Sequence, residues 1–359
     1  MAAHKRAIYT SALALVLVGV FGYLNFALSG EYHSGEGDRF VPLPELDKAD
    51  YDARLLALAH ASTTVATSTQ ARQALAGQAD PFATTTQLWP APAPYPNAGA
   101  ILPFKRIVAY YGNFFSRQMG VLGEYPPDEM LAMLASTTAM WQRADPSTPT
   151  LPAIQYIAVV AQNAPGKEGN YILRMPDEEI ERAYALAMRV HGILILDVQV
   201  GKSTLERELP LLEKYLRLPQ VHLAIDPEFS MKRGGAPGTV IGTYDASDIN
   251  YAAEYLAGLA RQYYLPPKVL VVHRFTQLMV TNYQEITPLP EVQIVMDMDG
   301  WGPPEKKEGT YNAVIAPEPV QFTGLKLFYH ADLKPPSTRL LTPEEILALT
   351  PAPIYIQYQ

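Results

Sequence analysis

The chain has 359 residues, of which 48% are hydrophobic, so it can bury one large core or two average ones. Its net charge of -8 provides no basic field for a phosphate backbone, so nucleic acid is not an expected partner. The chain has no cysteine, which excludes disulfides, thiolate metal ligands and a cysteine nucleophile.

The N-terminus carries a segment long enough to span a membrane. His4–Arg6 precede a run from Ala7 to Leu28 that contains no charged residue. A basic stretch followed by about 20 apolar residues is typical of a signal anchor, while Ala27–Ser29 resembles a signal-peptide cleavage site. We therefore expect residues 1–29 to be a signal anchor or a signal peptide. In both cases the rest of the protein is extracytoplasmic, either membrane-anchored through residues 7–28 or secreted.

Residues 30–100 have a different composition from the rest of the chain. One amphipathic helix is predicted over residues 47–61, whereas residues 61–70 (ASTTVATSTQ) and 89–100 (WPAPAPYPNAGA) are rich in small residues and proline. Sequences of this kind form extended spacers more often than packed domains. The region therefore predicts a low-complexity stalk that contains one short helix.

From residue 101 to the C-terminus, apolar runs alternate with helical patterns, which indicates a third region, residues 101–359. The runs are too apolar to be half-exposed strands, so they favour a parallel sheet that helices cover. We expect strands at Arg106–Tyr111, Ile154–Ala161, Gly192–Val198, Val221–Ile225, Lys268–His273, Val292–Met298, Leu325–Tyr329 and Ile354–Tyr358. We expect helices at Pro127–Arg143, Asp177–Val190, Thr204–Leu216, Ala246–Tyr264, Thr276–Tyr283, Glu305–Ala313 and Pro343–Leu349.

Eight strand and helix units over about 250 residues are typical of the (β/α)₈, or TIM, barrel. The alternative is an open, doubly wound sheet. The barrel is favoured because no glycine-rich phosphate loop follows a strand, and because the last strand can close against the first.

In such a barrel the active site lies at the carboxyl ends of the strands. The most informative strand end is HLAIDPEF, residues 222–229, which delivers Asp226 and Glu228 two positions apart. Side chains at this spacing share one face of a strand, so the two carboxyl groups would project together. The alternative for Asp226 is a structural turn before Pro227.

Polar and aromatic residues follow the other strands as well. Asp197 ends the third strand, where capping the next helix is an alternative role, and Asp299 follows the sixth. The predicted catalytic residues are Glu228, Asp226 and Asp299. The predicted substrate-binding residues are Asp197, Gln199, Tyr110, Tyr111, His273, Asp297, Trp301, Tyr329 and Gln357.

Two acids that act together can cleave a glycosidic bond, one as proton donor and the other as a source of charge, a nucleophile or a base. A neutral Glu228 would need a raised pKa, which the nearby charge of Asp226 could supply. Aromatic faces such as those of the tyrosines and Trp301 suit sugar rings. These residues predict a glycoside hydrolase or glycan-processing hydrolase that needs no cofactor or metal.

Two short motifs resemble those of chitinase-like glycoside hydrolases, which are TIM barrels. Residues 296–302 (MDMDGWG) resemble the M-x-Y-D-x-x-G stretch of that family, and residues 226–228 (DPE) resemble the end of its fourth-strand motif. The resemblance implies that Glu228 is the proton donor, Asp226 its partner and Asp299 a polar group that holds the reacting sugar.

The chain departs from the family pattern at three places. Val221–Leu223 stand where the family has further aspartates, Met298 replaces the motif tyrosine, and residues 354–359 lack the expected tryptophan. We therefore weigh three hypotheses. The first is an envelope-associated hydrolase that acts on a polysaccharide or cell-wall glycan, and the second is an inactive barrel that binds glycan or an envelope partner. The third is a metal-dependent hydrolase with ligands among Asp197, Asp226, Glu228, His273, Asp297, Asp299 and His330, although the sequence has no HxH or HExxH pair.

Overall fold

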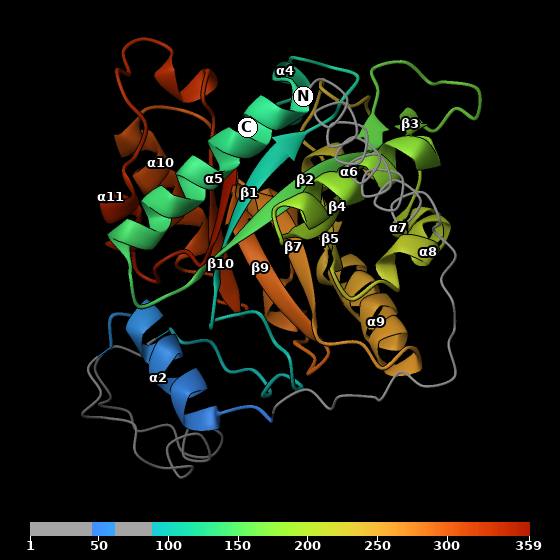
Figure 1. The fold of residues 1–359 in the computed structure, drawn as a ribbon. Coiled ribbons are helices and arrows are strands. Elements are labelled where there is room, and N and C mark those ends of the chain that lie inside the picture. Colours follow the sequence, from blue (N-terminus) through green and yellow to red (C-terminus); the bar gives the residue numbers. More distant parts are fainter. Residues whose placement is uncertain (1–44, 62–87) are drawn as a thin grey trace, which may run out of the picture. The chain divides into compact units, whose positions relative to one another are not determined.

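The structure, a computed structural model, describes residues 45–61 and 88–359, all of which belong to one unit of the chain, Leu43–Gln359. At the centre of this unit is a barrel of parallel strands with helices around it (Figure 1). The strands of the barrel are β1 (Arg106–Gly112), β2 (Thr150–Ala161), β4 (Ile193–Val198), β5 (Val221–Ile225), β7 (Lys268–Arg274), β9 (Val292–Met298), β10 (Phe322–Leu327) and β11 (Tyr355–Tyr358).

The barrel closes because β1 pairs in parallel with both β2 and β11. The remaining neighbours are also parallel, in the order β11, β10, β9, β7, β5, β4 and β2. A short strand, β3 (Ile172–Arg174), adds to the end of β2 in the antiparallel direction. The predicted barrel is thus confirmed. The open sheet is wrong, since its first and last strands would lack these ladders.

Helices connect successive strands and cover the outside of the barrel. They are α4 (Val121–Glu124), α5 (Pro127–Ala144), α6 (Asp177–Arg189), α7 (Leu205–Glu208), α8 (Glu213–Leu216), α9 (Ala246–Gln262), α10 (Pro304–Thr310) and α11 (Pro343–Leu347). Capping residues fix several starts. Asp245 caps α9 and Thr342 caps α11, each with a reciprocal side-chain contact from the third helical residue.

Two predicted helices differ from the structure. The helix expected at Thr204–Leu216 is divided into α7 and α8 by a 3₁₀ turn that contains Pro210, which has no N–H to donate. The helix expected at Thr276–Tyr283 does not form. Its β-branched pair, Val280–Thr281, instead forms β8, which pairs with β6 (Tyr244–Asp245), and the left-handed Asn282 ends the segment.

Side chains alternate across the barrel wall and build two separate cores. The outward side chains pack against the helices. The inward side chains near the amino ends of the strands form a second core that includes Ile107, Ile193 and Val269. Because this lower core fills the barrel, only its upper end, at the carboxyl ends of the strands, remains for a site.

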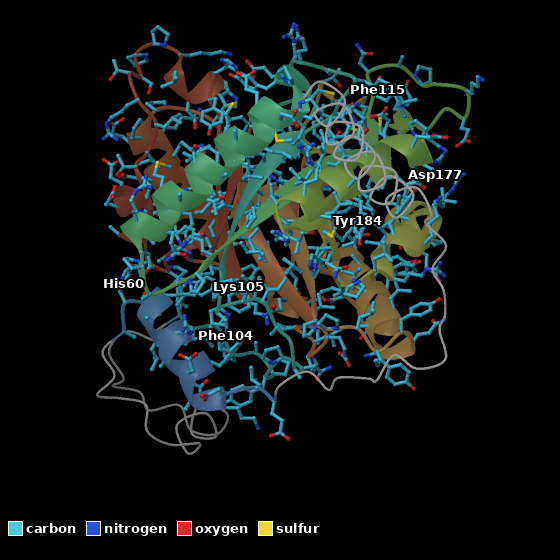
Figure 2. The ribbon with its side chains drawn as sticks, in the orientation of Figure 1. His60, Phe104, Lys105, Phe115, Asp177 and Tyr184 are labelled. Carbon is cyan, nitrogen blue, oxygen red and sulfur yellow. The ribbon has the colours of Figure 1, made fainter. Side chains whose placement is uncertain are left out.

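The lower core is closed by parts of the predicted stalk. Helix α2 (Lys48–Leu58), capped by Asp47, buries Tyr51 in this core. Phe104, in the segment that leads into β1, packs against the ring of Tyr51 at 6.0 Å, and His60 contacts the carbonyl oxygen of Leu347 at 3.1 Å (Figure 2).

Residues 88–100 also contact the barrel. The indole N–H of Trp89 donates to the carbonyl oxygen of Ala316 at 2.7 Å, and Asn97 N–H donates to Pro290 at 2.9 Å. These described parts of residues 30–100 therefore lie in the same unit as the barrel rather than in a separate stalk, because tertiary contacts override their low-complexity composition. Residues 30–44 and 62–87 lie outside the described residues.

The predicted membrane segment, residues 7–28, also lies outside the described residues. Among the helices that the structure describes, none is both long and apolar enough to cross a membrane.

Candidate active site

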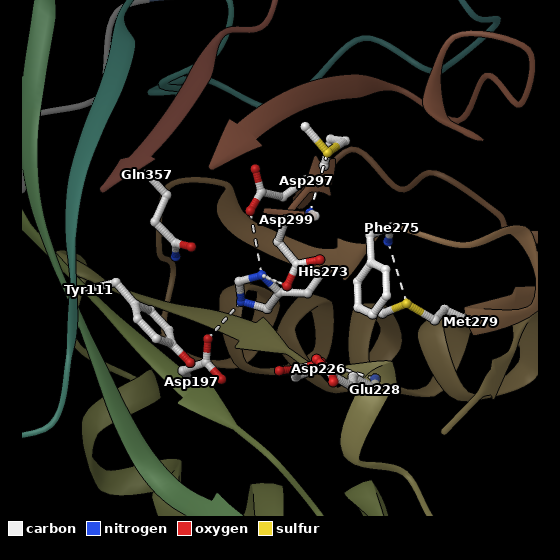
Figure 3. Close-up of polar contacts among 12 residues, drawn as sticks. Tyr111, Asp197, Asp226, Glu228, His273, Phe275, Met279, Asp297, Asp299 and Gln357 are labelled. Carbon is white, nitrogen blue, oxygen red and sulfur yellow. Dashed lines mark hydrogen bonds and ion pairs between the residues drawn. The ribbon is translucent and has the colours of Figure 1, made fainter. Parts of the chain in front are cut away.

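A cavity of about 450 Å³ lies at the carboxyl ends of the barrel strands. All three predicted catalytic residues line it, with Asp226 and Glu228 following β5 and Asp299 following β9 (Figure 3). Its other lining residues include Tyr111, Gln199, Phe229, Phe275, Trp301, Lys306, Lys326 and Phe328. The cavity therefore combines carboxyl groups with aromatic faces and two lysines.

Asp226 and Glu228 reach the cavity through a turn. Strand β5 ends at Ile225, and Asp226 caps the 3₁₀ turn Pro227–Phe229. The Glu228 backbone N–H donates to Asp226 Oδ1 at 3.0 Å. Both acids face the cavity, but the turn rather than strand alternation brings Glu228 there. Asp226 thus forms the structural turn before Pro227 and also lines the cavity.

Burial changes the protonation of both acids. Burial is the main cause of a Glu228 pKa of about 7, and the charge of Asp299 raises it further, whereas Lys326 and His273 lower it. Burial also raises the pKa of Asp226 well above its usual range. The expectation that Asp226 is the charge that raises the pKa of Glu228 is corrected, because burial and Asp299 are responsible.

Below the cavity, His273 of β7 lies between Asp197 of β4 on one side and Asp297 and Asp299, at the end of β9, on the other. Its Nε2 lies 2.8 Å from Asp197 Oδ2, and its Nδ1 lies 3.4 Å from both Asp297 Oδ2 and Asp299 Oδ2 (Figure 3). Burial alone would lower the pKa of His273, but the charge of Asp197 and its bond to Nε2, together with the nearby Asp297 and Asp299, raise it well above the usual value. His273 is therefore an imidazolium that partly neutralises a group of carboxylates.

A buried amide and a phenol complete this network. Gln155 Nε2 donates to Asp197 Oδ2 at 2.7 Å, while the Tyr355 hydroxyl donates to Gln155 Oε1. Gln357 Nε2 in turn donates to the Tyr355 hydroxyl at 3.0 Å. Gln357 and Asp197 are both inaccessible to solvent, so they support the floor of the cavity and do not line it.

Asp297 is the least compensated acid of the network. Neither of its carboxyl oxygens has a hydrogen-bond partner in the part of the chain that the structure describes. Burial raises its pKa, against the effect of His273. Space for its side chain comes from Gly324, where an added Cβ would lie 2.6 Å from Asp297 Oδ1. Asp297 also lies beneath the cavity rather than in its lining.

Tyr111 and Gln199 form part of the cavity wall. Gln199 Nε2 donates to the Tyr111 hydroxyl at 3.3 Å, and Gln199 Oε1 accepts from Ala161 N–H at 2.9 Å. Burial raises the pKa of Tyr111 well above 10, with Asp197 as the next cause. The Tyr111 hydroxyl therefore stays protonated at neutral pH.

Trp301 lies at the rim of the cavity and is 52% exposed. An indole that stays half exposed in the free protein offers apolar surface and one N–H donor at the rim.

Tyr110 and Tyr329, two predicted substrate-binding residues, lie outside the cavity. The Tyr110 hydroxyl bonds to Thr137 Oγ1 at 2.8 Å and to the Tyr329 hydroxyl at 3.0 Å, in the outer core against α5. The reason is strand alternation. Tyr110 and Tyr111 are adjacent on β1, so only one of the two can point into the barrel.

Among the residues of the site that were not predicted, Gln155, Tyr355 and Lys326 lie on strands of the barrel. A signal was present, because each is a polar side chain within an otherwise apolar strand and has the same parity as the inward residues of that strand. Such positions are costly in a barrel wall unless a polar partner lies inside it.

Among residues 45–61 and 88–359, no group of three His, Asp or Glu side chains has the arrangement of a metal site. His330, which we considered as a ligand, is 72% exposed and pairs with Glu124 at 2.9 Å.

No family model matches the chain, and no curated protein sequence matches it. Among solved structures it is similar to a ruminal GH26 endo-β-1,4-mannanase, with 12% identity and a TM-score of 0.34. The match covers 71% of this chain, which spans 59% of the length of that one. The resemblance to chitinase-like enzymes therefore rests on its short motifs.

Proposed function

We propose that this protein is a glycoside hydrolase that acts on a polysaccharide, with Glu228 as the proton donor. The observation that carries the proposal is the pairing of Glu228 with Asp299 in one cavity. Burial and the charge of Asp299 hold the pKa of Glu228 at about 7, so a large fraction of Glu228 is protonated at neutral pH.

The two acids have complementary roles in this reaction. Glu228 protonates the oxygen of the scissile glycosidic bond, so the leaving sugar departs as a neutral alcohol. Asp299 stabilises the positive charge that develops on the ring of the reacting sugar. His273, 3.4 Å from Asp299 Oδ2, holds this carboxylate in place from beneath. A water molecule then adds to the anomeric carbon and gives its proton to the Glu228 carboxylate, which completes the hydrolysis.

Several features support a carbohydrate as the substrate. The cavity is lined by five aromatic side chains: Tyr111, Phe229, Phe275, Trp301 and Phe328. It also offers polar groups that can bond to hydroxyls, among them Gln199 and the Tyr111 hydroxyl. Apolar faces interspersed with a few fixed polar groups are the expected surroundings of a sugar ring.

We further propose that the barrel works at the cell envelope. The support is the charge-free run from Ala7 to Leu28 after a basic N-terminus, which would anchor the protein or direct its export. A polysaccharide or cell-wall glycan would then be the substrate. Fractionation of cells that produce the full chain tests this, and recovery in the cytoplasmic fraction would contradict it.

The catalytic proposal is tested with the purified full-length chain on a panel of neutral and acidic polysaccharides, measured by release of reducing ends. Glu228→Gln should abolish release while glycan binding persists. Glu344→Gln is the matched control, because this exposed glutamate lies on α11. Glycan binding without any release by the unsubstituted protein would instead favour an inactive, glycan-binding barrel.

A further inference from the structure

We propose that the cavity binds an anionic glycan, in which Lys326 receives the carboxylate of an acidic sugar unit. This inference rests on the proposed function and narrows its substrate class. It starts from Lys326, whose ammonium group neither stabilises the barrel through a hydrogen bond or ion pair nor takes part in proton donation by Glu228.

Lys326 is buried yet faces the cavity. It lies on β10 with the inward parity of Phe322 and Gly324, is 4% exposed, and is part of the cavity lining. Its Nζ lies 3.8 Å from the centre of the Tyr111 ring and 5.0 Å from that of Phe328. Two aromatic faces therefore surround the ammonium group on the protein side.

The aromatic faces do not satisfy this ammonium group. A lysine ammonium has three hydrogen-bond donors, and a ring face compensates its charge only in part. Within the described residues, the ammonium group of Lys326 forms no hydrogen bond to an oxygen and no ion pair within 4.0 Å. A buried cation of this kind favours a ligand that brings its own oxygens and negative charge.

The acids of the site do not act as its counter-ion. Glu228 and Asp297 are close enough for Lys326 to lower the pKa of each. Neither acid forms an ion pair with Lys326, and His273 is the cation that pairs with Asp197, Asp297 and Asp299. A carboxylate supplied by the substrate would complete the coordination of Lys326.

A second lysine extends the cationic side of the cavity toward its rim. Lys306 also lines the cavity, and its Nζ lies 4.7 Å from the centre of the Trp301 ring. Lys334 lies over the same ring at 5.3 Å. A sugar unit bound beside Trp301 would thus lie close to two ammonium groups. This arrangement suits a polymer with repeated carboxylates better than a neutral one.

The experiment measures equilibrium binding of acidic polysaccharides to the full chain. The probes are polygalacturonate, alginate, hyaluronan and glucuronoxylan, each in its native form and after chemical reduction of its carboxylates to alcohols. We expect at least one native polymer to bind about tenfold or more tightly than its reduced form, because a charge-assisted bond is lost on reduction. Raised salt should weaken the native form selectively.

Substitutions assign the preference to Lys326. Lys326→Met, which keeps the aliphatic stem, should remove the preference for the native polymer, and Lys326→Arg should retain it. The matched control is Lys202→Gln, since Lys202 also stacks on a tyrosine, at 4.1 Å from the ring of Tyr171, but does not line the cavity. Thermal unfolding of each variant shows that it is folded.

The outcomes separate this inference from the proposed function. Equal binding of native and reduced polymers, or a preference that persists in Lys326→Met, overturns the inference even if neutral glycans are hydrolysed. A preference that depends on Lys326 without any hydrolysis supports the inference and contradicts the glycosidase proposal.

Discussion

His273 Nε2 lies 2.8 Å from Asp197 Oδ2, and neither side chain is more than 1% exposed. Removal of one partner from an ion pair at this depth destabilises the folded state, because the remaining charge has neither water nor a partner. On its other side, His273 Nδ1 lies 3.4 Å from Asp299 Oδ2. The residue thus connects a structural acid to an acid of the cavity.

We expect His273→Asn to lower the free energy of unfolding by about 3 kcal/mol or more, because it leaves the acids around it without their cation. The raised pKa of His273 sets the pH dependence. The folded state binds the proton more tightly than the unfolded state. The contribution of His273 is therefore fully present below about pH 6.5, its unfolded pKa, and is lost as pH rises through the higher folded value.

Urea unfolding of both proteins across this pH range checks the expectation. The difference in stability should be largest at the acidic end and should shrink on the alkaline side. The control is His191→Asn, since His191 is exposed on the surface after α6. This variant should have the same stability as the unsubstituted protein at every pH. An equal loss at every pH would mean that the charge of His273 does not stabilise the fold.

The pH dependence of hydrolysis should follow the ionisation of Glu228. Since its pKa is about 7, kcat/KM should fall above that pH as the proton donor becomes ionised. The measurement is kcat/KM from acidic to alkaline pH on the substrate that the panel identifies. A rate that stays constant through pH 9 would exclude Glu228 as the acid.

Tyr110 and Tyr111 provide a matched pair, because they are adjacent on β1 and face opposite sides of the barrel wall. We expect Tyr111→Phe to lower kcat/KM about tenfold, since Gln199 loses its partner beside the substrate. Tyr110→Phe should cost about 1 kcal/mol of stability through its bonds to Thr137 and Tyr329 and leave the kinetics unchanged. Kinetics and thermal unfolding of both variants check this. A loss of kcat/KM in Tyr110→Phe and not in Tyr111→Phe would contradict a site on the inner face of the barrel.

Trp301 should contribute to binding more than to chemistry. It lies at the rim, so Trp301→Ala should raise KM about fivefold, as expected for the loss of one aromatic contact, with little change in kcat. Steady-state kinetics on substrates of increasing length measure it. The control is Tyr264→Ala, an 82% exposed tyrosine that does not line the cavity. A change in kcat alone would place Trp301 at the reaction centre instead.

The strands of the barrel were predictable because parallel strands are buried on both faces and appear as apolar runs. Strands β5 and β9 occur at the predicted residues. The position of Asp226, Glu228 and Asp299 at one end of the barrel followed from the same pattern, because parallel strands place their carboxyl ends together.

Features that depend on long-range contacts were not predictable. The sequence places Tyr110 in the site, but the structure does not. Contacts of β1 with its neighbours decide which of its residues face inward, and the sequence alone does not show these contacts. The segment 276–283 has a helical pattern, but its pairing with β6 decides its structure. Likewise, no local signal shows that α2 closes the lower core of the barrel.

General acid catalysis by Glu228 is tested most directly with aryl glycosides of the sugar that the panel identifies, in a pair with a poor and an activated leaving group. Glu228→Gln should lose about 10²-fold or more of its rate on the poor leaving group. It should lose little on the activated one, which needs no proton to depart. Equal rates for Glu228→Gln and the unsubstituted protein on the poor leaving group would show that Glu228 is not the proton donor.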